Sequence, residues 1–168
     1  MRFLTLIFVL LSGAASAEPL PEFEALVAQC RASFDARPAV EVARVDTMNT
    51  WVKRAWAKTN IVYDVRKTDS LVTPFTAYIE TTEIVVTKKA ADEDGAKALE
   101  LSPDDRPAKF VKITNFAYQE RKWVATGGSI SIASKSGDGF ASPSVFEKSK
   151  KDVLASTGPL ANCLTLNR

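Results

Sequence analysis

The chain has 168 residues, 46% of them hydrophobic, which is enough to form the core of one domain. Its 22 basic and 20 acidic residues leave a formal net charge of only +2, and so weak a field argues against nucleic acid or an anionic membrane surface as a main partner. There is no histidine, which removes the commonest general base, the Ser-His-Asp and Cys-His nucleophile systems and the usual zinc ligand sets.

The first 17 residues are typical of a secretory signal peptide. Arg2 supplies the positive start, residues 3–11 are almost continuously apolar, and residues 15–17 are small, as a cleavage site requires. The apolar run is too short to span a bilayer, and no later segment approaches about 20 apolar residues. We therefore expect cleavage near Ala17, export to the periplasm or beyond, no stable membrane insertion, and a single mature domain over residues 18–168.

An amphipathic helix is predicted over residues 22–36. Its apolar residues recur at helical spacing on one stripe, which should cover the apolar face of a sheet: Phe23, Leu26, Val27, Cys30 and Phe34. Arg37 precedes Pro38, which stops the helix.

Cys30 and Cys163 are the only cysteines of the chain. In an oxidising compartment we expect a disulfide between them, and closing so long a loop would stabilise the fold by about 4–5 kcal/mol in the chain-entropy model. The alternative is a buried thiol at Cys30 with a free cysteine near the C-terminus.

The segment 39–58 is open to two interpretations. Val40, Val42 and Val45 fit a strand or the start of a second helix, and the apolar residues that follow fit helical spacing. Trp51 and Trp56 are typical of a core or its rim, while a carbohydrate or peptide groove lined by both is the functional alternative.

Two strands are predicted next, over residues 59–67 and 71–87, with a turn at residues 68–70. Glu80 and Glu83 are an odd number of residues apart, so they face opposite sides of a regular strand and cannot act as a carboxylate pair. A long exposed connection with a short helical turn at residues 96–101 then leads to Pro107.

The segment 109–132 predicts a hairpin around which the other elements are arranged. A two-residue turn at Glu120 and Arg121 sets Tyr118 opposite Trp123 and places Phe116 on the same face. Residues 134–144 have the composition of a flexible linker. A short amphipathic helix is predicted over residues 144–156 around Phe146, Val153 and Leu154, after which the chain returns Cys163 to the first helix.

Chemistry-bearing motifs are few. The sequence contains no Ser-x-x-Lys, no P-loop and no G-x-G-x-x-G, and the acidic stretch 92–95 lacks two of the strongest ligands of a calcium loop, so we expect no metal and no cofactor. A carboxylate base with a phenol donor is one arrangement still open. Its candidate residues are Asp64, Glu80, Tyr63, Tyr78 and Tyr118.

Residues 63–75, YDVRKTDSLVTPF, and residues 116–124, FAYQERKWV, resemble a core pattern of uncharacterised small exported bacterial proteins. The resemblance covers the middle third to half of the chain. It implies a helix packed on a curled antiparallel sheet, similar in outline to cystatin-like or nuclear-transport-factor-like (NTF2-like) domains, and carries over no catalytic residues.

The sequence thus predicts an α+β fold, with an N-terminal helix on a curled antiparallel sheet of four or more strands and one disulfide. The leading hypothesis for function is an exported, non-catalytic domain that binds a protein or small ligand. The candidate binding residues are Trp51, Trp56, Tyr78, Ser136 and Phe140. One alternative is an inhibitor or immunity protein against an extracytoplasmic enzyme such as a lysozyme, because residues 136–140, SGDGF, are weakly similar to the Ser-Gly-x-x-Tyr loop of periplasmic lysozyme inhibitors. The other is a histidine-free pocket enzyme of isomerase-like type.

Overall fold

A computed structural model describes residues 19–102, 105, 107–136, 139–154, 159 and 164. The predicted signal peptide, Cys163 and the middle of the 136–140 loop lie outside the described residues. Signal cleavage and the Cys30–Cys163 disulfide therefore stay predictions.

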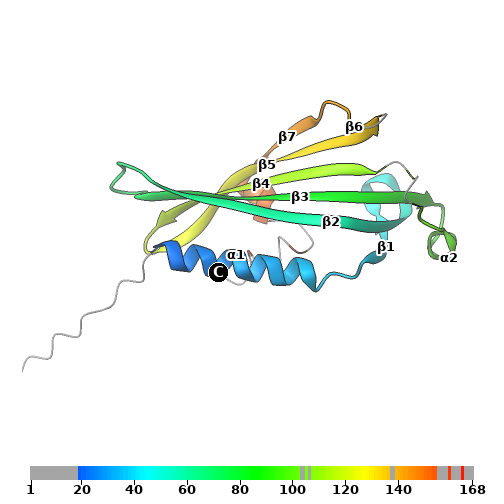
Figure 1. Ribbon diagram of the computed structural model, residues 1–168, viewed down its shortest axis with the longest axis horizontal. Coiled ribbons are helices and arrows are strands. Elements are labelled where there is room, and N and C mark those ends of the chain that lie inside the picture. Colours follow the sequence, from blue (N-terminus) through cyan, green and yellow to red (C-terminus); the bar gives the residue numbers. More distant parts are fainter. Residues whose placement is uncertain are drawn as a thin grey trace, which may run out of the picture.

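The described chain is an α+β fold in which helix α1 (Pro19–Asp35) lies along one face of a seven-stranded antiparallel sheet, as Figure 1 shows. The strands β1 to β6 are neighbours in sequence order, and β7 pairs with β5. The predicted α+β class, with an N-terminal helix on an antiparallel sheet, is therefore confirmed, with more strands than the minimum of four. The remaining elements are β1 (Val40–Val45), η1 (Asp46–Met48), β2 (Thr50–Lys67), β3 (Phe75–Ala90), α2 (Glu93–Ala98), β4 (Ala108–Gln119), β5 (Lys122–Ser136), β6 (Gly139–Phe140), β7 (Ser144–Ser149) and α3 (Lys150–Leu154).

The apolar stripe of α1 is buried against the sheet, as predicted. All five stripe residues are buried, and they join residues from β3, β4 and β5 in one core. Phe23 is fully buried, and its ring centroid lies 5.2 Å from that of Phe116 and 4.7 Å from that of Trp123. The Trp123 Nε1–H donates a 2.8 Å hydrogen bond to the Pro19 carbonyl, so the tryptophan also satisfies its own polar atom at the start of the helix.

The central hairpin has the predicted register. Tyr118 pairs with Trp123, and the turn residues Glu120 and Arg121 have φ angles of 50° and 63°. Positive φ at both central residues is the conformation of a type I′ turn, which matches the twist of the strands it joins. The turn forms although neither residue is the asparagine or glycine that favours it.

Of the two interpretations left open for residues 39–58 the strand holds, and the helix predicted over residues 144–156 is wrong for residues 144–149. The segment 39–58 forms β1, a short 3-10 turn and the first half of β2, so the helical interpretation there does not hold. Residues 144–149 form β7 instead of helix, and Lys150–Leu154, the last described residues of the predicted segment, form helix α3. In both places strand pairing decides the conformation, of β1 with β2 and of β7 with β5, and helical spacing of apolar residues does not reveal such pairing.

Boundaries elsewhere shift by a few residues. β3 begins at Phe75, directly after Pro74, and runs on to Ala90, past the predicted end at residue 87. Helix α2 begins at Glu93, earlier than the predicted turn at 96–101, because the Asp92 carboxylate caps it by accepting a 2.7 Å hydrogen bond from the Gly95 N–H. The predicted linker 134–144 contains the end of β5 and all of β6.

Two bulges keep the inner face of the sheet continuous. The register of β2 against β3 shifts between Trp56 and Lys58, which leaves Ala57 as an extra residue. The register of β5 against β4 shifts in the same way at Thr126. Because side chains alternate along a strand, each bulge lets residues on both sides of it point to the same face of the sheet, the face on which α1 lies. Bulges also bend the strand that carries them.

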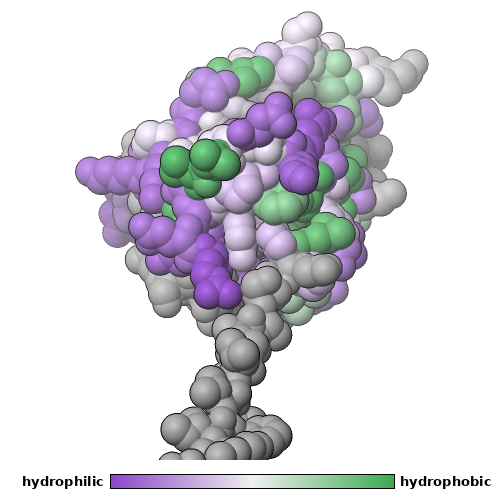
Figure 2. All heavy atoms as spheres, turned by 90° about the vertical axis from the view of Figure 1, so that its left-hand side faces the viewer, coloured by the Kyte–Doolittle hydropathy of each residue, from purple (hydrophilic) through white to green (hydrophobic). Residues whose placement is uncertain are grey.

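No helix among the described residues is long and apolar enough to cross a membrane. The end of the molecule at the left of Figure 1 faces the viewer in Figure 2, where separate hydrophobic side chains lie among mostly hydrophilic ones. The β2–β3 loop lies at this end and carries Leu71 and Val72, which are 100% and 75% exposed. Scattered exposed apolar residues of this kind do not by themselves mark a binding site.

Candidate ligand-binding cavity

The inner face of the sheet is longer than the helix that covers it. On β3, Ala77 and Ile79 belong to the core packed against α1, whereas Glu83 and Val85 lie further along the same face. These later residues border a cavity of about 880 Å³ beside the C-terminal end of α1. A volume of this size lies in the range of small-molecule sites in proteins.

The cavity wall combines apolar and charged side chains. Strand β2 contributes Val52, Arg54 and Trp56 from one face. The other described lining residues come from the end of α1 and the segment after it, from η1, from the neighbouring strands and, after α3, from Pro159: Ser33, Ala36, Arg37, Pro38, Glu41, Met48, Glu83, Val85, Thr87, Lys89, Ala108, Phe110, Lys112, Ile130 and Pro159.

Glu83 is the buried charge of this cavity. Its side chain is only 3% exposed, and its two carboxylate oxygens accept from different cations. Oε1 is bonded to the Arg37 guanidinium, and Oε2 lies 3.2 Å from the Lys112 ammonium. A carboxylate is tolerated at this depth because both of its oxygens are paired.

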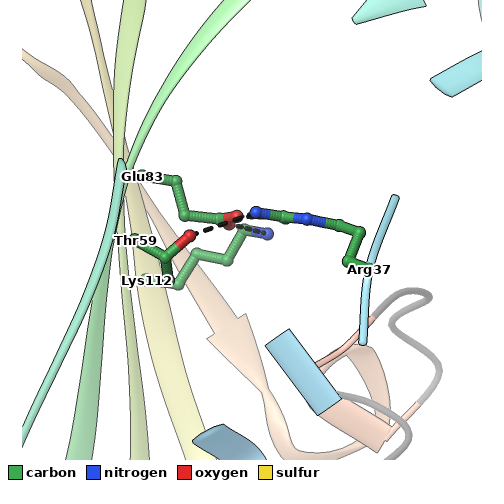
Figure 3. Close-up of polar contacts among 4 residues, drawn as sticks. All are labelled: Arg37, Thr59, Glu83 and Lys112. Carbon is green, nitrogen blue, oxygen red and sulfur yellow. Dashed lines mark hydrogen bonds and ion pairs between the residues drawn. The ribbon is translucent and has the colours of Figure 1, made fainter. Parts of the chain in front are cut away.

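Arg37 connects the end of α1 to the sheet. Figure 3 shows its side chain reaching across to Glu83 and Thr59, whose Oγ1 accepts a 3.1 Å hydrogen bond from the guanidinium. The guanidinium carbon also lies 4.0 Å from the centroid of the Trp56 ring. Arg37 thus closes one side of the cavity with an ion pair, a hydrogen bond and a cation–π contact.

Positive charge exceeds negative charge along the cavity wall. Among the described residues that line it, four are basic, Arg37, Arg54, Lys89 and Lys112, and two are carboxylates. Glu83 takes both of its cationic partners from this set. Arg54 lies opposite Glu41 in the β1–β2 register, yet within the described part of the chain no ion pair or hydrogen bond joins its guanidinium to another group.

The two candidate tryptophans lie in different places. Trp56 lines the cavity, while Trp51 is not among the described residues that border it. The pairing of β2 is regular between them, so the odd separation of five places them on opposite faces. The structure does not bring the pair together in one groove.

Tyr78 and Asp64 are cross-strand neighbours on the outer face of the sheet. They border a smaller hollow of about 430 Å³ together with Arg66, Asn115 and others. The Asp64 carboxylate accepts a 2.7 Å hydrogen bond from Arg66 Nε. A carboxylate and a phenol therefore border the same hollow, but the carboxylate is already paired with Arg66.

The other candidates are dispersed. Ser136 and Phe140 are exposed where β5 and β6 end, and Glu80 lies on the outer face, opposite in direction to Glu83, as predicted. Tyr63 and Tyr118 pack against the core. Burial, followed by the nearby Glu22 carboxylate, raises the pKa of the Tyr118 phenol.

Sequence reasoning missed Arg37, Glu83 and Lys112 as a group. One signal was present: strand alternation places Glu83 on the same face as Ile79 and Val85, so a charge is expected there among apolar residues. The partners of Glu83 were not evident, because Arg37 is 46 residues away in sequence.

Within the described segments, no three histidine, cysteine, aspartate or glutamate side chains gather as a metal site. No family model, no curated protein and no solved structure matches the chain.

Proposed function

We propose that the chain is a non-catalytic binding domain that holds a small, partly apolar molecule in the cavity beside the C-terminal end of α1. The observation that carries this proposal is the inner face of the sheet continuing past the helix, with Val85, Phe110 and Ile130 bordering open space. Pockets lined mainly by apolar side chains with a few placed polar groups are the usual form of small-molecule sites.

A binding role fits the chemistry of the wall better than a catalytic one. The buried carboxylate of Glu83 is held by Arg37 and Lys112, so both of its oxygens are already engaged. A general acid or base needs a group free to exchange a proton with a bound substrate. The Glu83 cluster instead supplies a fixed electrostatic environment.

A neutral fluorophore tests the proposal. Phenylnaphthylamine should gain fluorescence on entering the cavity, and Ala108→Trp should abolish the gain because the new indole fills part of the space. Asn115→Trp is the matched control, because Asn115 lies on the same strand but borders the outer hollow. Circular dichroism checks that both variants fold. No gain in the wild type, or an equal gain in both variants, would remove the proposal.

We also propose that the protein is exported, that Cys30 and Cys163 form a disulfide, and that the fold is cystatin-like or NTF2-like in outline. Cys30 is fully buried in the core, and Leu164, the neighbour of Cys163 in sequence, is part of that core as well, which supports the pairing. N-terminal sequencing of the exported protein and a thiol assay on the denatured protein would test cleavage near Ala17 and the disulfide. An unprocessed N-terminus or two titratable thiols would contradict them.

The inhibitor hypothesis keeps one supporting observation, the exposure of Ser136 and Phe140 at one end of the sheet. Residues 137 and 138 between them lie outside the described residues. Mutation of Ser136 should relieve inhibition of a lysozyme if this hypothesis holds, and failure to inhibit any lysozyme type would remove it.

A further inference from the structure

We infer that the cavity selects an anionic amphiphile, a molecule with an acidic head group and an apolar body. This inference rests on the proposed function, because it names the chemical class of ligand for the same site. It follows from the charges of the cavity wall, from its two basic side chains that have no ion-pair partner among the described residues, and from the apolar side chains of the same wall. Of these two, Lys89 has its Nζ 3.7 Å from the Met48 sulfur, whereas Arg54 has no hydrogen bond in the described part of the chain.

The charge balance of the wall favours an anion. Its four basic and two acidic described side chains leave a net charge of +2 (four minus two). Glu83 neutralises only one of the two cations that it contacts, so this cluster alone keeps a net charge of +1. Charges in a partly enclosed cavity are screened less than those on the surface, so the excess attracts an acidic group.

Arg54 is the group best placed to bind an acidic head. It lies on β2 between Val52 and Trp56, and all three border the cavity. No ion pair holds its guanidinium within the described part of the chain, unlike that of Arg37. A guanidinium binds a carboxylate through two parallel hydrogen bonds, which gives both affinity and orientation.

The apolar body would lie against the strands on the far side of the cavity. Val85, Phe110 and Ile130 come from three adjacent strands and border the same space. A neutral ligand would satisfy this part of the wall but leave Arg54 without a counter-charge. A small inorganic anion would pair with Arg54 but leave the apolar wall without a contact. An anionic amphiphile is the class of ligand that contacts both Arg54 and the apolar wall.

Three probes with the same hydrocarbon chain test the inference: dodecanoate, dodecanol and dodecyltrimethylammonium. Each probe is titrated against bound phenylnaphthylamine, the two ionic probes below their critical micelle concentrations and dodecanol below its solubility limit. Sodium phosphate without an amphiphile is the fourth arm. We expect dodecanoate to bind at least about tenfold more tightly than dodecanol, the difference that one charge-assisted contact supplies. Added salt should reduce this preference.

Arg54→Gln should weaken dodecanoate binding by about tenfold and dodecanol binding by much less, so that the preference for the acid falls sharply. Arg44→Gln is the matched control, because Arg44 lies on the outer face of β1 in contact with Asp46 and Asn49. Equal binding of acid and alcohol, tighter binding of the cation, or displacement by phosphate alone would overturn the inference and leave the proposed function standing. Failure of all four probes to displace the fluorophore would overturn the inference, and failure of the fluorophore itself to bind would overturn both.

Discussion

Removal of Arg37 should destabilise the protein far more when Glu83 is charged than when it is neutral. In the wild type, the Glu83 carboxylate is 3% exposed and depends on Arg37 and Lys112 for its partners. Arg37→Ala leaves a buried carboxylate with one cation 3.2 Å away, and breaking such a pair costs about 3 kcal/mol of unfolding free energy. For a chain of this size, that lowers Tm by about 6–12 °C.

The same change in a Glu83→Gln background removes a different set of interactions. The substituted side chain carries no charge, so Arg37→Ala then loses mainly the contact of the guanidinium with the Trp56 ring and the hydrogen bond to Thr59. We expect a cost of about 1 kcal/mol in that background. The coupling energy of the double-mutant cycle should therefore be about 2 kcal/mol.

Urea unfolding followed by circular dichroism measures all four corners of the cycle. Arg66→Ala is the control, because it removes an arginine–carboxylate ion pair, with Asp64, whose side chains are exposed, and it should cost less than about 1 kcal/mol. Equal costs of Arg37→Ala in the two backgrounds would refute the electrostatic account of the cavity wall. So would a cost no larger than that of the control.

Three further changes test the packing of the sheet. Thr81→Val should raise the unfolding free energy by about 1 kcal/mol, because the fully buried Thr81 hydroxyl has no hydrogen-bond partner among the described residues, and a lower stability in urea would contradict this. Gly128→Ala should lower it by about 3 kcal/mol, because an added Cβ would lie 1.9 Å from the Ile113 carbonyl oxygen, whereas Gly139→Ala, with open space around it, should have little effect by the same assay. Replacing Glu120-Arg121 by Asn-Gly should raise Tm, since each non-glycine residue at positive φ costs about 1 kcal/mol, and an unchanged Tm would exclude a strained turn.

The sequence was sufficient to predict those elements whose pattern involves residues close together in the chain. Phe23, Val27 and Cys30 recur at the period of a helix, and the hairpin register follows from alternation on either side of a short charged turn. Both features depend on residues close together in the chain, and both were predicted with the correct buried face.

Elements that depend on distant pairing could not be predicted in this way. Phe146 and Val153 fit a helical stripe. Phe146 nevertheless belongs to β7, because this segment pairs with the edge of β5. The bulge at Ala57 changes which residues of β2 face inward, so Trp56 and Ile61 share a face although their separation of five would place them on opposite sides of a regular strand. Alternation read across the whole strand therefore fails at the point where the core gives way to the cavity.

The cavity was the hardest feature to foresee. Its ionic cluster joins Arg37, Glu83 and Lys112 from three separate elements, and only Glu83 carries a sequence signal, a charge on an apolar strand face. The sequence-based candidates contributed Trp56 alone to this space. Tyr78 borders the outer hollow, Ser136 and Phe140 lie at the ends of strands, and Trp51 is not among the described residues that border the cavity.

A crystal structure with ω-bromododecanoate tests the central claim most directly. The account predicts anomalous bromine density inside the cavity, near Phe110 and Ile130, with the carboxylate within hydrogen-bond distance of the Arg54 guanidinium. Bromine found only in the outer hollow beside Tyr78, or only on the exposed surface, would contradict it.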